Sequence, residues 1–245
     1  MGNLRGIFFD LDDTLIDSTG AMRAAIGAIL HLVPEHSPDE IADALKCAYQ
    51  QLWGYGTPGY IALKTIATPD LRRQLTQLAL GSLGITSPIR FREIQQTYEA
   101  AEHVALQALP GTRDTLQALQ PYFSLGIITN GPSNIQREKL AQVGLAEFFN
   151  VVVADADFGA PKPDPQLFDY AGELLGLSSS ELMFVGDSPE ADIAGASAAG
   201  WVSVLLGASS GSEASFCIEK LEEILLLPPI LETKHLHLAQ RSPIL

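Results

Sequence analysis

The chain has 245 residues, which is enough for one or two domains and for a sizeable hydrophobic core. Hydrophobic residues make up 47% and charged residues 18%, a balance that excludes a largely disordered chain. The formal net charge of −14 would repel a phosphate backbone, so we expect no general binding to nucleic acid, whereas an excess of carboxylates suits a hard divalent cation.

Five short apolar runs predict buried strands. Each run is nearly continuous rather than alternating, as in strands that are covered on both faces. The runs are Gly6–Phe9, Leu125–Ile128, Val151–Val153, Leu182–Val185 and Val202–Leu206. Helical patterns separate the later runs, so strand and helix alternate from about residue 112 to 227. This alternation predicts an α/β fold with a doubly wound, Rossmann-like parallel sheet.

The stretch from residue 17 to 108 separates the first predicted strand from the second and has no convincing strand pattern. Helical periodicity covers residues 21–32, 40–52, 71–80 and 91–106, and prolines punctuate these segments. We therefore predict an α/β core formed by residues 1–16 and 109–245, and a helical module of residues 17–108 inserted into it. Residues 230–245 show no clear pattern.

The two cysteines, Cys47 and Cys217, lie far apart in segments with helix-like patterns and fit neither a disulfide framework nor a zinc site. This favours a reduced, intracellular setting. The N-terminus lacks the pattern of a secretory signal, and the apolar run 224–227 is too short to span a bilayer. We expect a cytoplasmic protein without a membrane partner.

Two carboxylates follow the first predicted strand. Asp10 stands where the strand ends, and in an open α/β sheet ligands collect at the carboxyl ends of the strands. Asp10 and Asp12 can face one site if the backbone leaves regular strand geometry, one as a nucleophile and the other as an acid or base. The alternative is an acidic turn in which Asp13 or Thr14 caps a helix.

Two further polar segments follow later strands. Thr129, Asn130 and Gly131 end the second predicted strand, where a hydroxyl and backbone N–H groups can hold a phosphate oxygen. The alternative is a cap for the helix that begins near residue 132 or 133. Lys162 lies between prolines that stiffen its loop, so it is either a pre-positioned ammonium group or an ordinary solvated lysine.

The fourth predicted strand ends in Gly186 and Asp187, with Asp192 five residues further on. Gly186 allows a close approach of the backbone, and Asp187 ends its strand as Asp10 does. Oxygen ligands from two strand ends are what Mg²⁺ requires. The alternative for this segment is a helix cap, with Asp187 or the following serine as the capping residue.

These segments, in this order, resemble the four motifs of the haloacid dehalogenase-like hydrolase superfamily. The DxDxT signature is met by Asp10, Asp12 and Thr14, and the later motifs are Thr129, Lys162, and Gly186-Asp187 through Asp192. The resemblance covers about residues 4 to 227. The helical insert resembles the cap domain that this superfamily places between its first two motifs.

The resemblance implies a Mg²⁺-dependent phosphatase that acts on a small phosphate ester. It implies that Asp10 forms an aspartyl-phosphate, and that Asp12 protonates the leaving alcohol and then activates water. The implied ligands of Mg²⁺ are the Asp10 and Asp187 carboxylates and the Asp12 backbone carbonyl, with Asp192 behind them. The residues implied to hold the phosphate are Thr129, Asn130, Lys162, Thr14 and Gly131. We expect a monomer or a homodimer.

Three other functions stay open at this point. A sugar phosphomutase has a similar pair of aspartates but transfers the phosphate to a sugar hydroxyl. A 2-haloacid dehalogenase uses the same nucleophile on carbon but lacks the second aspartate of the signature, which is present here as Asp12. A non-catalytic protein on the same scaffold usually lacks a catalytic group, and none is missing here.

The sequence leaves the substrate open among phosphoglycolate, a nucleoside monophosphate and a sugar phosphate. The loop from Trp53 to Tyr60 offers aromatic faces that can touch an organic substrate, although its aromatic side chains can equally pack the insert itself. Cations that could meet a second acidic group of the substrate are Arg23, Lys64, Arg72 and Arg73, although single charges are usually solvated.

Overall fold

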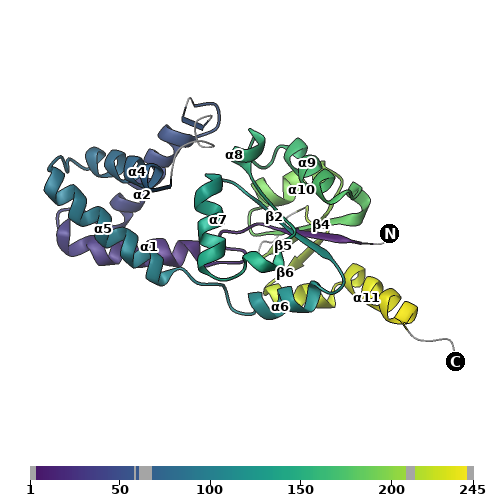
Figure 1. Ribbon diagram of the computed structural model, residues 1–245. Helices are drawn as coiled ribbons and strands as arrows, with labels where there is room; N and C mark the ends of the chain where they lie inside the picture. The colour runs from purple at the N-terminus through teal and green to yellow at the C-terminus, as the bar shows by residue number, and fades with distance from the viewer. Residues whose placement is uncertain (1–3, 58, 61–67, 208–212, 242–245) are drawn as a thin grey trace. The chain divides into compact units, whose positions relative to one another are not determined.

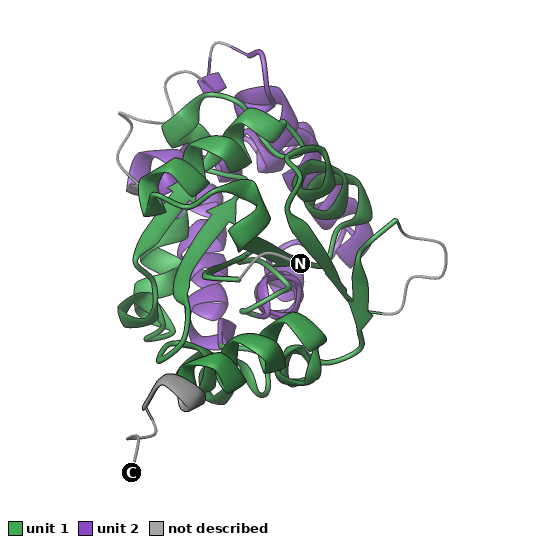
Figure 2. Cartoon of the chain, turned by 90° about the vertical axis from the view of Figure 1, so that its right-hand side faces the viewer, with its two compact units in different colours: residues 1–16, 108–131, 136–245 green, residues 17–107, 132–135 purple. Residues whose placement is uncertain are grey.

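The structure is a computed structural model that describes residues 4–57, 59–60, 68–207 and 213–241. The chain divides into two compact units (Figure 2). Unit 1 consists of residues 1–16, 108–131 and 136–245, and unit 2 consists of residues 17–107 and 132–135. Each unit has its own buried hydrophobic residues, as expected of a separately packed domain.

Unit 1 contains a parallel sheet of six strands in the order β3-β2-β1-β4-β5-β6. The strands are β1 Gly6–Phe9, β2 Ser124–Thr129, β3 Val151–Ala154, β4 Leu182–Gly186, β5 Val202–Leu206 and β6 Phe216–Ile218. β1 lies in the middle and pairs with β2 on one side and β4 on the other. The predicted parallel α/β core is confirmed. The strand order reverses between β1 and β4, the place where open α/β sheets bind their ligands.

Helices flank this sheet (Figure 1). They are α6 Thr112–Leu119, α7 Ser133–Gln142, α8 Asp155–Phe158, α9 Pro165–Leu175, α10 Ala194–Ala198 and α11 Pro228–Arg241. An aromatic cluster joins the sheet to α9, because Phe168 packs on Phe184 and on Trp201 with ring centroids 5.1 and 5.6 Å apart. Gly126 in β2 faces Phe8, and a Cβ there would lie 2.2 Å from the ring, so the close packing requires glycine.

One sequence prediction for unit 1 is wrong. Cys217 lies in β6, not in a helix, whereas Cys47 is helical as predicted. The segment after residue 229, which the sequence left unassigned, belongs to α11 up to Arg241. The prolines at 228 and 229 begin this helix, since proline lacks only an N–H group that the first turn of a helix leaves unpaired anyway. Both cysteines are exposed.

The described part of unit 2 is helical. Its helices are α1 Ser18–Ile29, α2 Pro38–Trp53, α4 Thr68–Ser82 and α5 Pro88–Ala105. Ser37 caps α2 in a reciprocal capping box with Glu40, and Ser87 caps α5. No helix in the described ranges has the length and apolar character needed to cross a bilayer.

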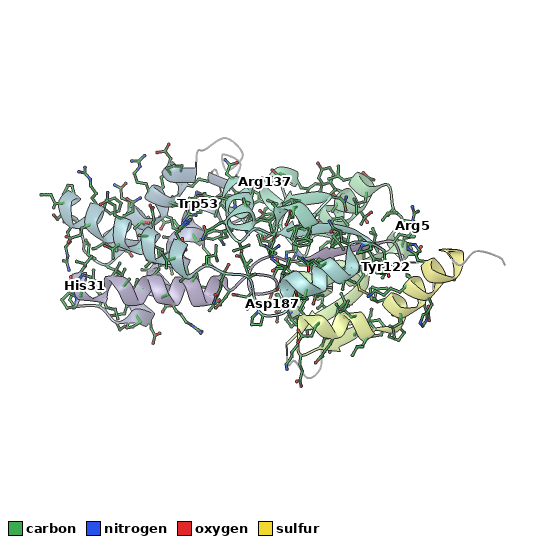
Figure 3. The ribbon with its side chains drawn as sticks, turned by 60° about the horizontal axis from the view of Figure 1, so that its bottom comes forward. Arg5, His31, Trp53, Tyr122, Arg137 and Asp187 are labelled. Atoms are coloured by element: carbon green, nitrogen blue, oxygen red, sulfur yellow. The ribbon has the colours of Figure 1, made fainter. Side chains whose placement is uncertain are left out.

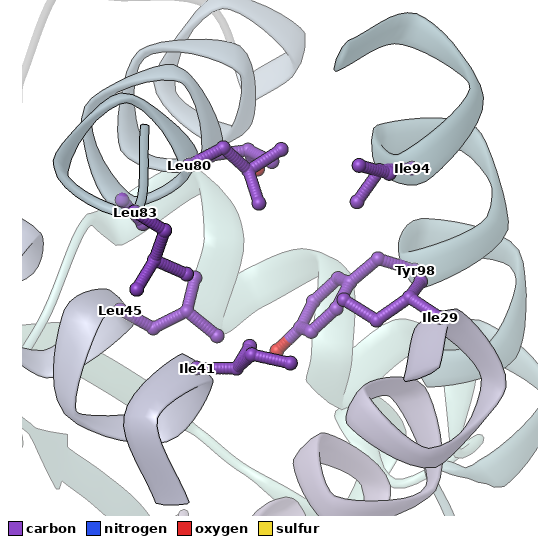
Figure 4. Close-up of a pocket in the computed structure, with 9 residues that line it drawn as sticks. Ile29, Ile41, Leu45, Leu80, Leu83, Ile94 and Tyr98 are labelled. Atoms are coloured by element: carbon purple, nitrogen blue, oxygen red, sulfur yellow. The ribbon is translucent and has the colours of Figure 1, made fainter. Parts of the chain in front are cut away.

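The helices of unit 2 enclose a cavity of about 10 Å³ (Figure 4). Its lining is almost entirely apolar and includes Ile41, Leu80 and Ile94. Tyr98 also lines it, and burial raises the pKa of the Tyr98 hydroxyl. The volume is at the lower limit for one water molecule, so this cavity is a packing gap rather than a ligand site.

Candidate active site

The loop after β1 brings two carboxylates and a hydroxyl toward the carboxyl edge of the sheet. A sharp turn forms because Leu15 and Ile16 both donate backbone N–H groups to the carbonyl of Leu11. Asp13 in this turn has a φ of 60°, in the left-handed region that Asp tolerates better than most residues. The alternative that Asp13 or Thr14 caps the following helix is wrong, because the cap of α1 is Asp17.

Lys162 lies between two buried carboxylates. Its Nζ atom is 2.5 Å from Asp10 Oδ1 and 2.6 Å from Asp192 Oδ1, and the residue is 5% exposed. The ammonium group also lies 5.3 Å from the centre of the Phe184 ring. Burial alone would lower the pKa of Lys162, but the two carboxylates hold it above its ordinary value. The alternative of a solvated lysine is therefore wrong.

Burial raises the pKa of Asp10 to about 7, and the neighbouring Asp192 and Asp12 charges add to the rise that Lys162 opposes. A carboxyl group with such a shift is typical of a functional site, where burial and like charges are arranged around a reacting group. Asp10 is 7% exposed, so its carboxylate is held almost entirely by the protein.

Asp187 and Asp192 complete an acidic cluster with Asp10. Asp187, which is labelled in Figure 3, follows β4 directly and is exposed, and Thr14 Oγ1 donates to its Oδ1 at 3.3 Å. Carboxylate oxygens of the three aspartates lie within 4.8 Å of one another. Burial and the Asp192 charge raise the pKa of Asp187. Ser188 caps the following helical turn through its hydroxyl, so capping and acidic clustering coexist in this segment.

Hydrogen bonds join the residue after β2 to the loop that carries Lys162. The Asn130 side chain donates to the Lys162 carbonyl at 3.2 Å and accepts the Lys162 N–H group at 2.9 Å. This pair of bonds fixes the backbone from which the lysine side chain extends. The Asn130 amide is therefore occupied within the protein, which leaves its backbone N–H group as the part suited to a phosphate.

Asp155, at the start of α8, is a buried residue that the sequence analysis missed. Its Oδ1 atom accepts N–H groups from Gly131 at 2.7 Å and from Ala156 at 2.6 Å. Asp155 thereby ties the loop after β2 to the end of β3. The Gly131 N–H group, which the sequence assigns to phosphate binding, donates to Asp155 in this structure, and its predicted role stays a prediction.

Helix α7 supplies two further residues that the sequence analysis missed. Gln136 Nε2 lies 2.7 Å from Asp12 Oδ2 and 2.6 Å from Thr129 Oγ1. Lys139 Nζ lies 2.7 Å from Asp12 Oδ1. The only signal in the sequence is their spacing of three residues, which places both side chains on one face of a helix that follows Thr129.

The aromatic residues of unit 2 differ in burial. Trp53 is 3% exposed and meets the ring of Tyr49 at a centroid distance of 5.5 Å, and Tyr60 is 6% exposed, so both are buried aromatic side chains. Tyr55 is 64% exposed and meets the edge of Tyr60 at a centroid distance of 5.4 Å. Pro58, within the same loop, lies outside the described residues.

Two of the predicted cations of unit 2 are paired with carboxylates. Arg72 lies 2.8 Å from Glu102, and Arg73 lies 2.8 Å from Asp70. Arg23 is exposed. Lys64 lies outside the described residues.

Comparison with known proteins gives concordant matches. The sequence profile of the haloacid dehalogenase-like hydrolases matches residues 4–200. A phosphoserine phosphatase from Thermus thermophilus is 36% identical over 155 residues, which cover 62% of this chain and 61% of that protein. A glyceraldehyde 3-phosphate phosphatase from Methanopyrus kandleri is 30% identical over 208 residues, which cover 82% of this chain and 83% of that protein. The magnesium-bound structure of the putative HAD-hydrolase YfnB from Bacillus subtilis aligns with a TM-score of 0.66 and 25% identity, over 92% of this chain and 98% of that chain.

Proposed function

Because the chain belongs to the haloacid dehalogenase-like hydrolases, we propose that it hydrolyses small phosphate monoesters through a phosphoaspartate at Asp10. The observation that carries this proposal is the buried contact of the Lys162 ammonium group with Asp10, at the carboxyl edge of the sheet. The names of two relatives, a phosphoserine phosphatase and a glyceraldehyde 3-phosphate phosphatase, support the same class of reaction.

In this proposal Asp10 is the nucleophile and Asp12 transfers the protons. An oxygen of Asp10 forms a bond to phosphorus while the bond between phosphorus and the leaving oxygen breaks. Asp12 donates a proton to that oxygen, so the product leaves as an alcohol. Asp12 then accepts a proton from the water that attacks phosphorus. The bond between phosphorus and Asp10 breaks, which releases inorganic phosphate and restores both side chains.

Groups from three loops hold the phosphoryl oxygens in this proposal. The Lys162 ammonium group lies against Asp10, and a fixed positive charge there opposes the repulsion between a carboxylate and an anionic ester. The Thr129 hydroxyl and the Asn130 N–H group, at the end of the neighbouring strand β2, are suited to the remaining oxygens.

The residues present fit a divalent cation. Lys162 supplies one positive charge against the three carboxylates of Asp10, Asp187 and Asp192, so two negative charges are unmatched within this cluster. Lys162 binds one oxygen of Asp10 and one of Asp192, and the second Asp192 oxygen accepts the Ser188 N–H group. The second Asp10 oxygen and the Asp187 carboxylate, with the Asp12 backbone carbonyl, are therefore the proposed ligands of Mg²⁺. Bound there, Mg²⁺ would polarise the phosphoryl oxygens.

The substrate is proposed only as a small phosphorylated metabolite, because the two relatives are named for different esters. Transfer to water rather than to a sugar hydroxyl is favoured because both are named phosphatases. The presence of Asp12, held on both carboxylate oxygens, favours a phosphatase over a 2-haloacid dehalogenase. The cytoplasmic location and the monomeric or homodimeric state remain predictions of the sequence.

The experiment that tests the proposal compares two asparagine variants in hydrolysis of p-nitrophenyl phosphate with Mg²⁺ present. Asp10→Asn keeps the shape of the side chain but removes the attacking charge, so turnover should fall by at least about a thousandfold. Asp13→Asn makes the same chemical change three residues after Asp10 in the same loop and should keep most of the turnover. Near-normal turnover in Asp10→Asn would refute the phosphoaspartate mechanism.

A further inference from the structure

Both carboxylate oxygens of Asp12 are held by side chains of α7. Gln136 Nε2 donates to Oδ2 at 2.7 Å, and Lys139 Nζ donates to Oδ1 at 2.7 Å. The Lys139 side chain is 19% exposed and that of Asp12 is 31% exposed, so the ion pair is partly shielded from water. Two donors on two oxygens fix both the position and the rotation of the carboxylate plane.

Gln136 also joins Asp12 to the predicted phosphate-binding hydroxyl. Its amide nitrogen is 2.6 Å from Thr129 Oγ1 as well as 2.7 Å from Asp12, and the residue is 2% exposed. The same nitrogen also lies 3.3 Å from the Asn130 carbonyl oxygen, but its two hydrogens serve best the two nearer acceptors, Asp12 and Thr129. Because Thr129 accepts a hydrogen bond from Gln136, the hydrogen of its own hydroxyl stays available to a phosphoryl oxygen.

We propose that Gln136 and Lys139 are positioning residues for the phosphatase reaction. Lys139 holds the Asp12 carboxylate where the leaving oxygen departs, and Gln136 sets the distance and orientation of Asp12 relative to the Thr129 hydroxyl. Small displacements of a proton-transferring group carry large kinetic penalties, so such a clamp contributes to rate without touching the substrate. This inference rests on the proposed function.

A purely structural role for the same contacts makes a different prediction. If α7 were only being anchored to the loop after β1, losing a contact would lower stability and reduce the hydrolysis of every ester alike. A positioning role instead affects the step in which the leaving oxygen takes a proton. That step matters little for a good leaving group such as p-nitrophenolate and much for the more basic phenolate.

The test measures kcat/KM for phenyl phosphate and for p-nitrophenyl phosphate, two esters of similar shape. Lys139→Met should lose about 10- to 100-fold on phenyl phosphate, part of the range of general acid catalysis, and far less on p-nitrophenyl phosphate. Lys139→Arg should recover most of the loss. Arg137→Met is the matched control, since it removes one positive charge from the same helix, where Arg137 bonds to Val152 and Asp157.

Gln136→Met should give a second signature, because the Thr129 hydroxyl loses its orienting donor. We expect the same leaving-group selectivity together with weaker competitive inhibition by inorganic phosphate, whereas Lys139→Met leaves that inhibition close to the wild-type value. Thermal melting of each variant shows whether the fold is retained.

Equal losses on both esters in Lys139→Met, or no loss on either while the wild type is active, would overturn the inference and leave the phosphatase proposal standing. An inactive wild-type protein, or an Asp10→Asn variant that keeps its turnover, would refute the phosphatase proposal, and the inference falls with it.

Discussion

Replacing Lys162 by methionine leaves two carboxylates without the cation that lies between them. Lys162 contacts Asp10 at 2.5 Å and Asp192 at 2.6 Å, and the exposed fractions of Lys162, Asp10 and Asp192 are 5%, 7% and 1%. Methionine fills a similar volume, so the perturbation is mainly the loss of charge. The consequence should appear in the free energy of unfolding of unit 1 as well as in turnover.

The magnitude follows from the burial of the group that is removed. Breaking a buried ion pair by deleting one partner costs about 3–5 kcal/mol, because the other charge stays buried. For a protein of this size, that corresponds to a melting temperature lower by roughly 6–20 °C. The cost is largest for carboxylates that stay ionised, so it should depend on pH.

The direction of the pH dependence follows from the Asp10 pKa. Burial raises it from 3.8 to about 7 in the folded protein, so the folded state binds the proton more tightly than the unfolded state does. Ionisation of Asp10 therefore lowers stability as pH rises from 3.8 to about 7. Without Lys162 the pKa of Asp10 rises further, so the deficit of the variant should be largest at neutral pH and should shrink toward pH 4.

The assay is urea denaturation with EDTA present, so that no divalent cation replaces the lost ammonium group. Lys220→Met is the matched control, because Lys220 is exposed. The double variant Lys162→Met/Asp192→Asn should recover part of the stability, since one of the two uncompensated carboxylates is gone. A deficit below about 1 kcal/mol, typical of a surface ion pair, or a deficit that does not change with pH, would refute the reasoning.

Two further predictions concern the metal and the substrate. Asp187→Ala should abolish stimulation by Mg²⁺ in a titration of the rate, because Asp187 is a proposed ligand, while the melting temperature in EDTA changes little, because the residue is exposed. Full activity at the same Mg²⁺ concentration would show that it is no ligand. In unit 2, Tyr60→Ala should lower the melting temperature because Tyr60 is 6% exposed, whereas Tyr55→Ala, at 64% exposed, should change kcat/KM selectively across a panel of phosphate esters. A uniform loss on every ester in Tyr55→Ala would exclude a role in selectivity.

The sequence predicts the sheet well where strands are long and buried on both faces. The five predicted runs correspond to β1–β5. A short, nearly continuous apolar run has side chains that must be buried on both faces, as in the middle of a covered parallel sheet. β6 was missed because Phe216–Ile218 is only three residues long, with an exposed Cys217 in its middle. α11 was missed because prolines usually interrupt a helix, and only the structure shows that these two lie in its first turn.

Some residues of the candidate site could be predicted from the sequence, and others could not. The residues at the strand ends were predictable, because the carboxyl ends of parallel strands meet at one edge of the sheet. Gln136, Lys139 and Asp155 were not, since a polar residue on a helix is ordinarily solvated and nothing in its own segment shows what it will contact. Their roles depend on where α7 and the end of β3 come to lie against loops more than 20 residues away.

Three contacts of the proposed site join segments of unit 1. Thr14 binds Asp187, Asn130 binds the backbone of Lys162, and Gln136 binds Asp12, so each of these loops is held by a side chain from another loop or helix of the same unit. The groups proposed for the reaction at phosphorus therefore come from unit 1. If unit 2 contributes contacts to the leaving group, its substitutions should alter the choice of ester without altering the leaving-group dependence that Lys139 and Gln136 set. A substitution in unit 2 that changes the leaving-group dependence of the rate, without changing the choice of ester, would contradict this division between the two units.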